Sequence, residues 1–340
     1  MVSMDVFKGD AFSATSLTAS VDKVGYVPTL LDSMPGLFMD KPIRTTDVWI
    51  EERDNGPALI QTSERGSPIA EKEGDKRKAR SFRTVRLAQK SRIMSEELQN
   101  IRAFGQETEL KQLQTEIARR QVLMRNDMQL TREHHALGCL QGLVTDADGS
   151  TLYNWATEFG QTIPVEVDFD LDAPTPASGV VRKKCNAAVR SILRGLKGLG
   201  GNQVEVIGLA GDNFWDDLTA HSEVRETYLQ TQAAASLREG NAFESFRYGG
   251  ITWINYRGTD DGSTVAVGTD KAKFFPRNAG IFQRAWAPAE RFEFVNTPGK
   301  QLYSWIVLDR DDNAWADVKQ FAYPLYVCVQ PQALYRAKRT

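Results

Sequence analysis

The chain has few residues of the types that perform catalysis. Its histidines are His134, His135 and His221. His134 and His135 are adjacent in a charged helical stretch, where successive side chains point about 100° apart and cannot share a metal ion, so we expect a solvated helix face. His221 follows a predicted helix break, where a local capping or packing role is expected. Because no nucleophile is paired with a base, the sequence predicts no catalytic residues and no hydrolase.

The cysteines Cys139, Cys185 and Cys328 stand far apart, and no two of them form a C-x-x-C pair. This spacing is typical neither of a disulfide framework nor of a zinc site, so no metal is expected at the thiols. Unpaired thiols indicate a reducing compartment.

Two acidic clusters are candidate cation sites. Asp168, Asp170 and Asp172 alternate along the chain, so an extended backbone would place their carboxylates on one face. A solvated strand edge that discourages pairing is the favoured interpretation, and a bound divalent ion is the alternative. The segment Asp146-Ala147-Asp148-Gly149 lacks the third acidic position and the closing glutamate of an EF-hand loop, and we interpret it as a β-turn.

The glycine-rich segment from Gly195 to Gly201 superficially resembles a phosphate-binding loop. It is expected to follow a helix and to precede a strand. That order is the reverse of the strand, loop and helix that point backbone amides at phosphate. We interpret the segment as a helix stop, and the sequence predicts no cofactor and no enzymatic activity.

A basic run between Arg65 and Arg92 is the most informative part of the sequence. It follows a predicted strand, Val48–Glu52, and has too few apolar residues to pack on its own chain, so it is expected to form a long two-stranded arm that needs a partner. Phe82 is the aromatic residue that interleaves with the charges from Lys76 to Arg92, so the stacking platform of a single-strand nucleic-acid binder is missing. A contact with another subunit is at least as good an explanation as nucleic acid. The candidate contact residues are Arg65, Lys76, Arg77, Lys78, Arg80, Arg83 and Arg86.

Length and composition indicate an ordinary folded chain. With 340 residues, of which 41% are apolar and 25% charged, it is able to bury a sizeable core, usually in two domains. The formal charge of −2 gives no global attraction to nucleic acid or to an anionic membrane. No signal pattern is present and no apolar stretch approaches the roughly 18 residues of a spanning helix, so we expect a soluble intracellular protein with no membrane partner.

Periodicity predicts the elements that position these residues. Residues 1–44 show no durable period and are expected to form an arm that lies over other structure. Glu107–Leu143 is free of proline, and its apolar residues recur at spacings of three, four and seven, which predicts one long helix with one face on a sheet. Thr151–Phe169 is expected to be a hairpin, because β-branched and aromatic residues dominate it.

The segment 173–179 carries two prolines and predicts a domain boundary. Beyond it, helical and strand patterns alternate over some 130 residues, which is a fitting size for one compact α/β unit. The expected elements are a helix capped by Ser178, a strand Val204–Leu209, helices after Asp212 and Ser222, and a hairpin Phe246–Tyr256 that turns at Gly249-Gly250.

Motifs along most of the chain resemble those of one virus family. The first group is Thr45–Glu52, Leu59-Ile60, Arg65-Gly66-Ser67-Pro68, Ile93, Leu98 and Arg102-Ala103-Phe104-Gly105. The second group is Phe246 with Tyr248–Ile251, Tyr256-Arg257-Gly258, Lys273–Arg277, Phe282, Ala287–Glu290, Val295–Gly299, Pro324-Leu325, Pro331 and Leu334. Together they cover roughly residues 45–335 and are similar to the lambda-type tailed-phage major capsid proteins, the capsid protein E family.

The resemblance implies an α+β fold of the Hong Kong 97 type. The parts it implies are an N-terminal arm over 1–44, an extended loop over 45–92, a peripheral domain with spine helix and hairpin over 93–176, an axial domain over 177–305, and closing strands over 306–340 that are shared with the peripheral domain. The arm, loop, long helix and α/β unit expected from the residues stand in the same order.

The function implied is a major head protein that self-assembles as pentamers and hexamers into an icosahedral shell around double-stranded DNA. Scaffold and portal proteins, and in some members a decoration protein, are the further partners. Assembly in the bacterial host cytoplasm and residence in the virion capsid follow. The alternatives are an encapsulin-like cellular compartment and a basic-armed nucleic-acid-binding module.

Overall fold

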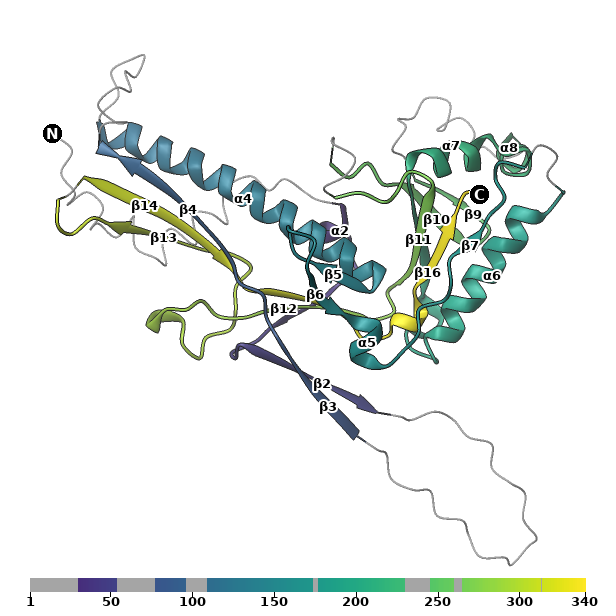
Figure 1. Ribbon diagram of the computed structural model, residues 1–340, viewed down its shortest axis with the longest axis horizontal. Coiled ribbons are helices and arrows are strands. Elements are labelled where there is room, and N and C mark those ends of the chain that lie inside the picture. The colour runs from purple at the N-terminus through teal and green to yellow at the C-terminus, as the bar shows by residue number, and fades with distance from the viewer. Residues whose placement is uncertain are drawn as a thin grey trace, which may run out of the picture.

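The computed structural model describes residues 30–53, 77–95, 109–173, 177–229, 245–259, 265–312 and 314–340. Figure 1 shows an elongated molecule. At one end a long helix lies along a thin sheet, and at the other end helices cover a larger sheet. A two-stranded hairpin projects from between the two ends.

The larger sheet has six strands and mixed directions. Across the sheet the order is β7 (Val167–Asp168), β16 (Tyr335–Lys338), β11 (Lys271–Arg277), β8 (Glu205–Ala210), β10 (Ile251–Asn255) and β9 (Ser245–Tyr248). β8 and β10 run parallel, whereas β9 pairs antiparallel with β10. The predicted Gly249-Gly250 hairpin is confirmed, because both glycines have the positive φ that this tight turn requires.

Three helices cover one face of this sheet. They are α6 (Val180–Gly195), α7 (Asp212–Ala220) and α8 (Ser222–Leu229), and they bury one apolar cluster against the strands. The helix predicted after the domain boundary is confirmed, but its cap is not Ser178. Gly179 precedes α6, and the Glu223 carboxylate accepts the backbone N–H groups of Val181 (3.2 Å) and Arg182 (3.1 Å) instead.

The ends of α6 and α8 follow local chemistry. α6 stops at Gly195, and Lys197, Gly198, Gly200 and Gly201 all take positive φ, which confirms the glycine run as a helix stop, followed by a short 3-10 turn, η3 (Gly201–Gln203). At the start of α8, His221 Nδ1 lies 3.3 Å from the backbone N of Glu223 and accepts its hydrogen bond, so the predicted capping role of His221 is confirmed.

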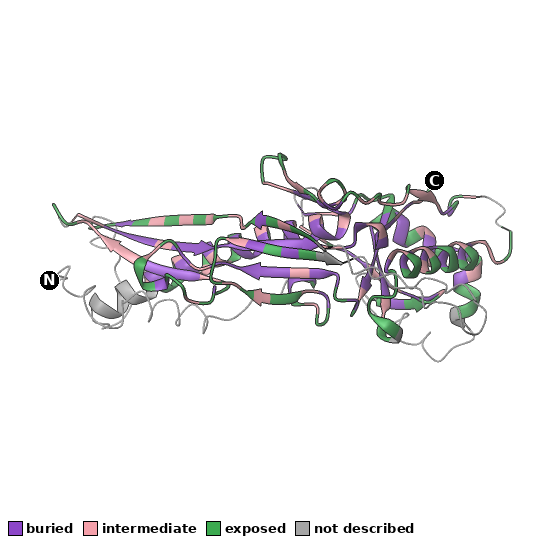
Figure 2. Cartoon of the chain, turned by 90° about the horizontal axis from the view of Figure 1, so that it is seen from below, coloured by how far each residue is buried: buried purple, intermediate pink, exposed green. Residues whose placement is uncertain are grey.

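The long helix α4 (Glu109–Gln141) confirms the helix predicted over 107–143 and extends about 50 Å. Its first half lies on a three-stranded sheet of β13 (Tyr303–Leu308), β14 (Trp315–Ala322) and β4 (Leu87–Met94). The packing is one-sided, because Ile117 is 3% exposed and Leu123 is 52% exposed. Figure 2 shows this end as a thin layer with buried residues inside.

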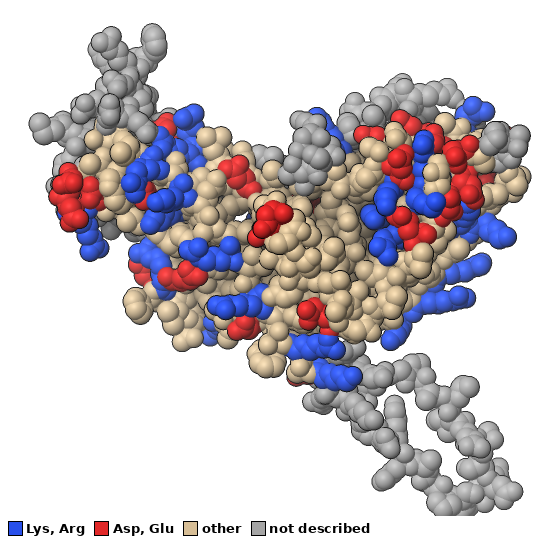
Figure 3. Space-filling view, viewed as in Figure 1, with Lys and Arg blue, Asp and Glu red and all other residues tan. Residues whose placement is uncertain are grey.

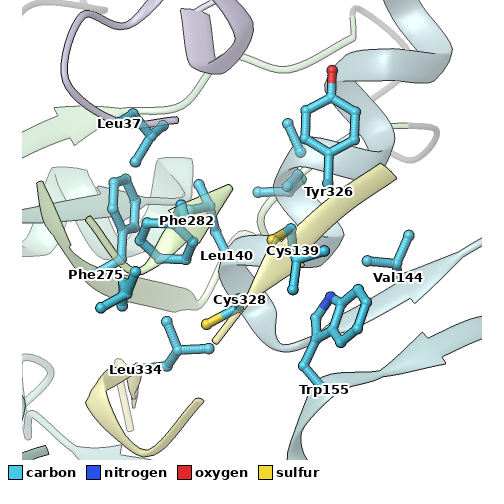
Figure 4. Close-up of a cluster of buried hydrophobic side chains, with 14 of the residues drawn as sticks. Leu37, Cys139, Leu140, Val144, Trp155, Phe275, Phe282, Tyr326, Cys328 and Leu334 are labelled. Carbon is cyan, nitrogen blue, oxygen red and sulfur yellow. The ribbon is translucent and has the colours of Figure 1, made fainter. Parts of the chain in front are cut away.

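The second half of α4 enters a deeper core. It packs on β15 (Pro324–Cys328), which forms a sheet with β12 (Phe282–Trp286) and β1 (Met39–Pro42). Figure 4 shows Cys139 and Leu140 of α4 facing Tyr326 and Cys328 of β15. Both cysteines are free and fully buried, and burial raises the pKa of the Cys328 thiol to about 12, so these thiols serve as packing groups.

The remaining elements connect these layers. The projecting hairpin consists of β2 (Asp47–Arg53) and β3 (Arg77–Arg83), and a short helix, α2 (Leu30–Ser33), precedes β1. After α4 come β5 (Leu143–Thr145), β6 (Thr151–Asn154) and α5 (Trp155–Phe159). Two further 3-10 turns are η4 (Phe292–Phe294) and η5 (Pro331–Ala333).

The hairpin predicted over 151–169 is wrong. β6 pairs instead with β5, around the predicted turn in which Gly149 N donates to Asp146 O at 3.0 Å. Trp155–Phe159 is helical because Asn154 accepts the Thr157 amide at its start and Gly160, with φ 61°, ends it. Cap signals at both ends outweigh the strand preference of the aromatic residues between them.

The solvated position predicted for His134 and His135 is wrong for His135, which is 1% exposed and lies 6.5 Å from the Tyr326 ring. His134 is half-buried, and its Nε2 lies 3.1 Å from Thr145 Oγ1. The charged neighbours suggested a surface, but Arg132 and Glu133 are themselves buried. Burial lowers the pKa of His135 to about 4, with the nearby His134 adding to the effect.

The acidic edge predicted at Asp168, Asp170 and Asp172 is confirmed in part, because β7 is an edge strand and Asp170 and Asp172 are exposed, but the extended backbone that would place all three carboxylates on one face is wrong. Asp168 lies in β7, which pairs with β16, and its carboxylate binds Lys338 at 3.1 Å. Asp170 leaves the extended conformation with φ 48° and pairs with Lys184. Across the described ranges, no group of three or more His, Cys, Asp or Glu side chains could hold a metal ion, and no helix is long and apolar enough to cross a bilayer.

Leu140→Ala should lower the free energy of unfolding by about 2 to 5 kcal/mol, because it leaves a cavity where Leu140 is 1% exposed. The matched control is Leu123→Ala on the same helix, where the loss should stay within about 0.5 kcal/mol. Urea unfolding of the unassembled protein measures both. Equal losses would contradict the one-sided packing of α4.

His135 should make the protein less stable in mild acid. An unfolded histidine has a pKa of about 6.5, whereas the folded value is about 4. The stability that depends on the neutral ring is therefore present above pH 6.5 and lost as the pH falls through 4, in total about 3 kcal/mol. His135→Leu should flatten this pH dependence in urea unfolding, and an unchanged acid slope would refute the assignment.

Candidate assembly interface

The hairpin of β2 and β3 is the part of the chain least supported by its own fold. The two strands pair over seven residues, from Asp47 with Arg83 to Arg53 with Arg77, and no third strand joins them in the part of the chain that the structure describes. Figure 1 shows the pair leaving the body of the molecule. An isolated two-stranded hairpin is marginal in water, so its outer part calls for another surface.

The root of the hairpin is held by aromatic packing. Phe82 is 4% exposed, and its ring centroid lies 5.2 Å from that of Trp155 and 5.6 Å from that of Phe159. The Tyr153 hydroxyl donates a 2.7 Å hydrogen bond to the Arg83 carbonyl. These contacts fix the direction in which the hairpin projects.

The opposite face of the hairpin points outward. Strand alternation buries Val48 and Ile50 and leaves Trp49 70% exposed, opposite the exposed Ser81. The exposed Lys78 lies on the same two strands. An exposed tryptophan is poorly suited to water and well suited to a protein surface, where aromatic anchors carry much of the binding energy.

The seven predicted contact residues fall into distinct groups. Arg65, Lys76 and the side chain of Arg77 lie outside the described residues. Lys78 and Arg83 are exposed, as a contact surface requires.

Arg80 and Arg86 have partners within the chain. The Arg80 guanidinium lies 5.8 Å from the Phe159 ring centroid. Arg86 pairs with Glu290 at 3.1 Å and lies 5.2 Å from the Phe321 ring centroid. Both side chains therefore help to hold the base of the hairpin on the body.

The end of the basic run is also neutralised within the chain. Arg92 binds Asp317 with two hydrogen bonds, of 2.7 and 3.2 Å, and lies 4.0 Å from the Trp315 ring centroid. The hydrogen bond from Arg92 is the main cause that lowers the pKa of Asp317. Among the described residues of the run, the exposed cations without an ion pair, Lys78 and Arg83, thus lie on the hairpin, and the run is not one uniform surface.

A buried ion network holds the segment that leads into the hairpin. The Asp32 side chain is 2% exposed and binds both Arg132 of α4, at 2.6 Å, and Arg284 of β12. Tyr326 of β15 donates its hydroxyl to Asp32 at 3.0 Å. Arg284 also binds the Asp40 carboxylate of β1, at 2.6 and 3.0 Å.

Glu133 of α4 extends the network on its other side. Its carboxylate accepts the backbone N–H groups of Leu31 and Asp32, each at 3.0 Å, and the Tyr256 hydroxyl at 3.0 Å. Burial, reinforced by the Glu133 charge, raises the pKa of Tyr256, so the phenol stays a donor. One helix residue therefore connects the N-terminal segment to the end of β10.

The electrostatics keep the network charged. Burial alone would raise the pKa of Asp40, but the hydrogen bonds and charge of Arg284 outweigh it, and the pKa is lowered. Burial alone would lower the pKa of Arg132, and the partners Tyr326 and Asp32 raise it instead. The arrangement does structural chemistry, because its ion pairs join α2, α4, β12 and β1 to one another.

The sequence analysis did not predict this network, and it did not predict the exposed apolar side chains of the segment around η4. Phe292 is 99% exposed and Val295 is 59% exposed, both around η4 between β12 and β13. Arg291 in the same segment lies 5.0 Å from the Trp305 ring centroid, which holds the segment on the body. The alternating Phe292-Glu293-Phe294 pattern after Pro288 was the available signal, and it resembled an ordinary strand.

Comparison with known proteins identifies relatives over nearly the whole chain. The family model described as phage major capsid protein E matches residues 13–339. The major capsid protein of Salmonella phage Felix O1 is 26% identical over 363 aligned positions, which cover 95% of this chain and 95% of that protein. The major capsid protein of Pseudomonas phage KPP10 is 26% identical over 356 positions, which cover 96% and 97%.

A solved structure shows the same fold. The crystal structure of a putative capsid protein of a prophage from E. coli CFT073 superposes with a TM-score of 0.57, at 13% identity, over 96% of this chain and 99% of that one. The expected α+β fold of the Hong Kong 97 type is confirmed.

Asp32→Asn should destabilise the protein by about 3 to 5 kcal/mol, because it leaves two arginines buried without their shared counter-charge. Asp127→Asn is the matched control, since Asp127 is an exposed residue of α4 whose carboxylate accepts one hydrogen bond from Gln89. Urea unfolding compares the two variants with the unchanged chain. A loss for Asp32→Asn no larger than that of the control would mean that the network is not a constraint on folding.

Proposed function

We infer the function of this chain from its family: it belongs to the phage major capsid protein E family, and it is a structural protein of a phage head shell, not an enzyme. The finer role that we propose is assembly into pentamers and hexamers that close an icosahedral shell around double-stranded DNA. Scaffold and portal proteins, and in some shells a decoration protein, are the proposed further partners, with assembly in the cytoplasm of the bacterial host.

The projecting hairpin is the observation that carries this proposal. β2 and β3 leave the body without a third strand among the described residues, while Trp49 on the outer face is 70% exposed. A chain that exposes such an arm as a monomer gains most by laying it on a neighbour. Repeating that contact over many copies buries far more area than a standard interface of about 1,600 Å².

The proposed division of the chain follows the same logic. We assign 1–44 to an N-terminal arm, 45–92 to the extended loop, 93–176 to a peripheral domain, 177–305 to an axial domain and 306–340 to closing strands. The pairing of β14 with β4 supports closing strands that return to the peripheral sheet. Because that ladder begins at Leu87, the last residues of the proposed extended loop, 87–92, also pair with the peripheral sheet.

The phage shell is favoured over the two alternatives. Both full-length relatives are major capsid proteins of phages, which supports a phage head over a cellular compartment. A nucleic-acid-binding module would need a continuous basic surface, but Arg86 and Arg92 pair within the chain.

Reversing four charges of the arm should stop shell formation without unfolding the chain. The variant is Lys76→Glu, Arg77→Glu, Lys78→Glu and Arg83→Glu, which spares the cations that support the body. Each exposed pair contributes about 0 to 1 kcal/mol, but the four act together at every contact. Co-expression with a scaffold, followed by sedimentation and negative-stain microscopy, measures the yield of particles.

The control exchanges lysine and arginine at the same four positions and keeps the charge, so it should assemble normally. Normal particle yield from the glutamate variant would rule out an assembly role for these cations. When the variant replaces the unchanged chain in a phage infection, particles that form but contain no DNA would move the role to packaging.

A further inference from the structure

One face of α6 carries a row of cations that the fold does not use. The five exposed basic residues are Arg182, Lys183, Arg190, Arg194 and Lys197, called here the α6 stripe. The four that lie in α6 extend over about 18 Å of helix, and Lys197 follows just after its end. Within the part of the chain that the structure describes, none of the five makes an ion pair, whereas Lys184 on the flank binds Asp170.

Acidic side chains gather on the neighbouring helices. Asp212 and Asp216 of α7 and Glu226 of α8 are exposed and make no ion pair among the described residues; these three form the α7–α8 acidic patch. Arg225 lies among them. Asp217 and Asp270, close by, are instead paired with Arg339 at 3.0 and 3.2 Å.

The two surfaces lie at different parts of the rim. Figure 3 shows Lys and Arg along the right edge, where Figure 1 draws α6, with side chains that project away from the body in the plane of the view. Asp and Glu gather at the upper right, over α7 and α8. Because the view is down the shortest axis, the α6 stripe lies on the edge of the molecule and not on one of its broad faces.

We propose that the α6 stripe of one copy of this chain docks on the α7–α8 acidic patch of the next copy in a ring. This inference rests on the proposed shell function. A shell one subunit thick meets enclosed DNA with a broad face and meets its neighbours with its rim. A contact between two different patches of identical chains is heterologous, which is the kind that closes rings.

The composition of the α6 stripe also favours a protein partner. Leu193, 46% exposed, lies within it, and Leu199, 48% exposed, lies just beyond its end. Exposed leucines add apolar area to a protein contact and add nothing to a phosphate contact, which is governed by charge. Complementary charge on the two surfaces determines which edge of one copy binds which edge of the next copy.

A charge-swap experiment tests the pairing. The first variant carries Arg182→Glu, Arg190→Glu and Arg194→Glu, and the second carries Asp212→Lys, Asp216→Lys and Glu226→Lys. Each should fold, by circular dichroism and melting, and yield at least about tenfold fewer particles, because like charges then face each other at every contact. The chain that combines both sets should recover particles, since the attraction is restored with its sign exchanged.

Two further variants keep the test decisive. Arg182→Lys, Arg190→Lys and Arg194→Lys preserves the charge and should assemble as the unchanged chain does. Arg182→Gln, Arg190→Gln and Arg194→Gln removes the charge, so it replaces the glutamate variant if that chain does not fold. Its particle yield should fall by less than that of the glutamate variant.

The outcomes separate the alternatives. Normal particles from the glutamate or the glutamine variant would overturn the proposal. A combined variant that folds but stays unassembled, when each single set has lost assembly, would overturn the pairing of these two surfaces. If the unchanged chain with its scaffold forms no particles, the proposed shell function itself fails.

Discussion

The buried carboxylate of Asp32 is the constraint on which the arrangement of the chain depends. Its side chain is 2% exposed and contacts Arg132 of the long helix and Arg284 of β12. An uncompensated charge in such a place costs several kcal/mol, so the three elements that supply these groups must meet together. These ion pairs therefore fix α2, α4 and β12 relative to one another, in addition to any apolar contacts between them.

The rest of the layout follows from the neighbours of that carboxylate. Arg284 uses its remaining hydrogen bonds on Asp40, which places β1 parallel beside β12, and β1 leads directly toward the projecting hairpin. On the other side Glu133 binds the α2 backbone and Tyr256. A single polar network thus sets where the hairpin leaves the body and how the long helix meets the six-stranded sheet, a role of specificity more than of net stability.

Sequence patterns predicted the elements that depend on residues close together in the chain. The long helix could be predicted because proline is absent and apolar residues recur at helical spacing. The β9–β10 turn could be predicted because a pair such as Gly249-Gly250 between two strand patterns is typical of a tight hairpin turn. The candidate site was predictable only in outline: a basic arm without a core of its own. Which of its cations are free depends on partners such as Phe159 and Glu290, and those are distant in sequence.

The Asp32 network could not be predicted from sequence patterns, because its partners are also distant along the chain. Asp32 and Arg284 are 252 positions apart, and a charged residue in a helical pattern looks the same whether water or another charge receives it. His135 shows the consequence, because its charged neighbours suggested a surface while the helix was entering the core. Short cap signals at Asn154 and Gly160 likewise decided α5 against the preference of its aromatic residues.

Buried charges and surface charges serve opposite purposes in this chain. Inside, the ions are buried, paired and costly to separate, so they hold one arrangement throughout the life of the molecule. At the rim the cations of the hairpin and of α6 are solvated, and each is worth at most about 1 kcal/mol in a contact. Contacts of that strength form and dissociate readily, which lets a growing shell correct a misplaced copy. Only when many copies surround one another do such contacts sum to a permanent structure.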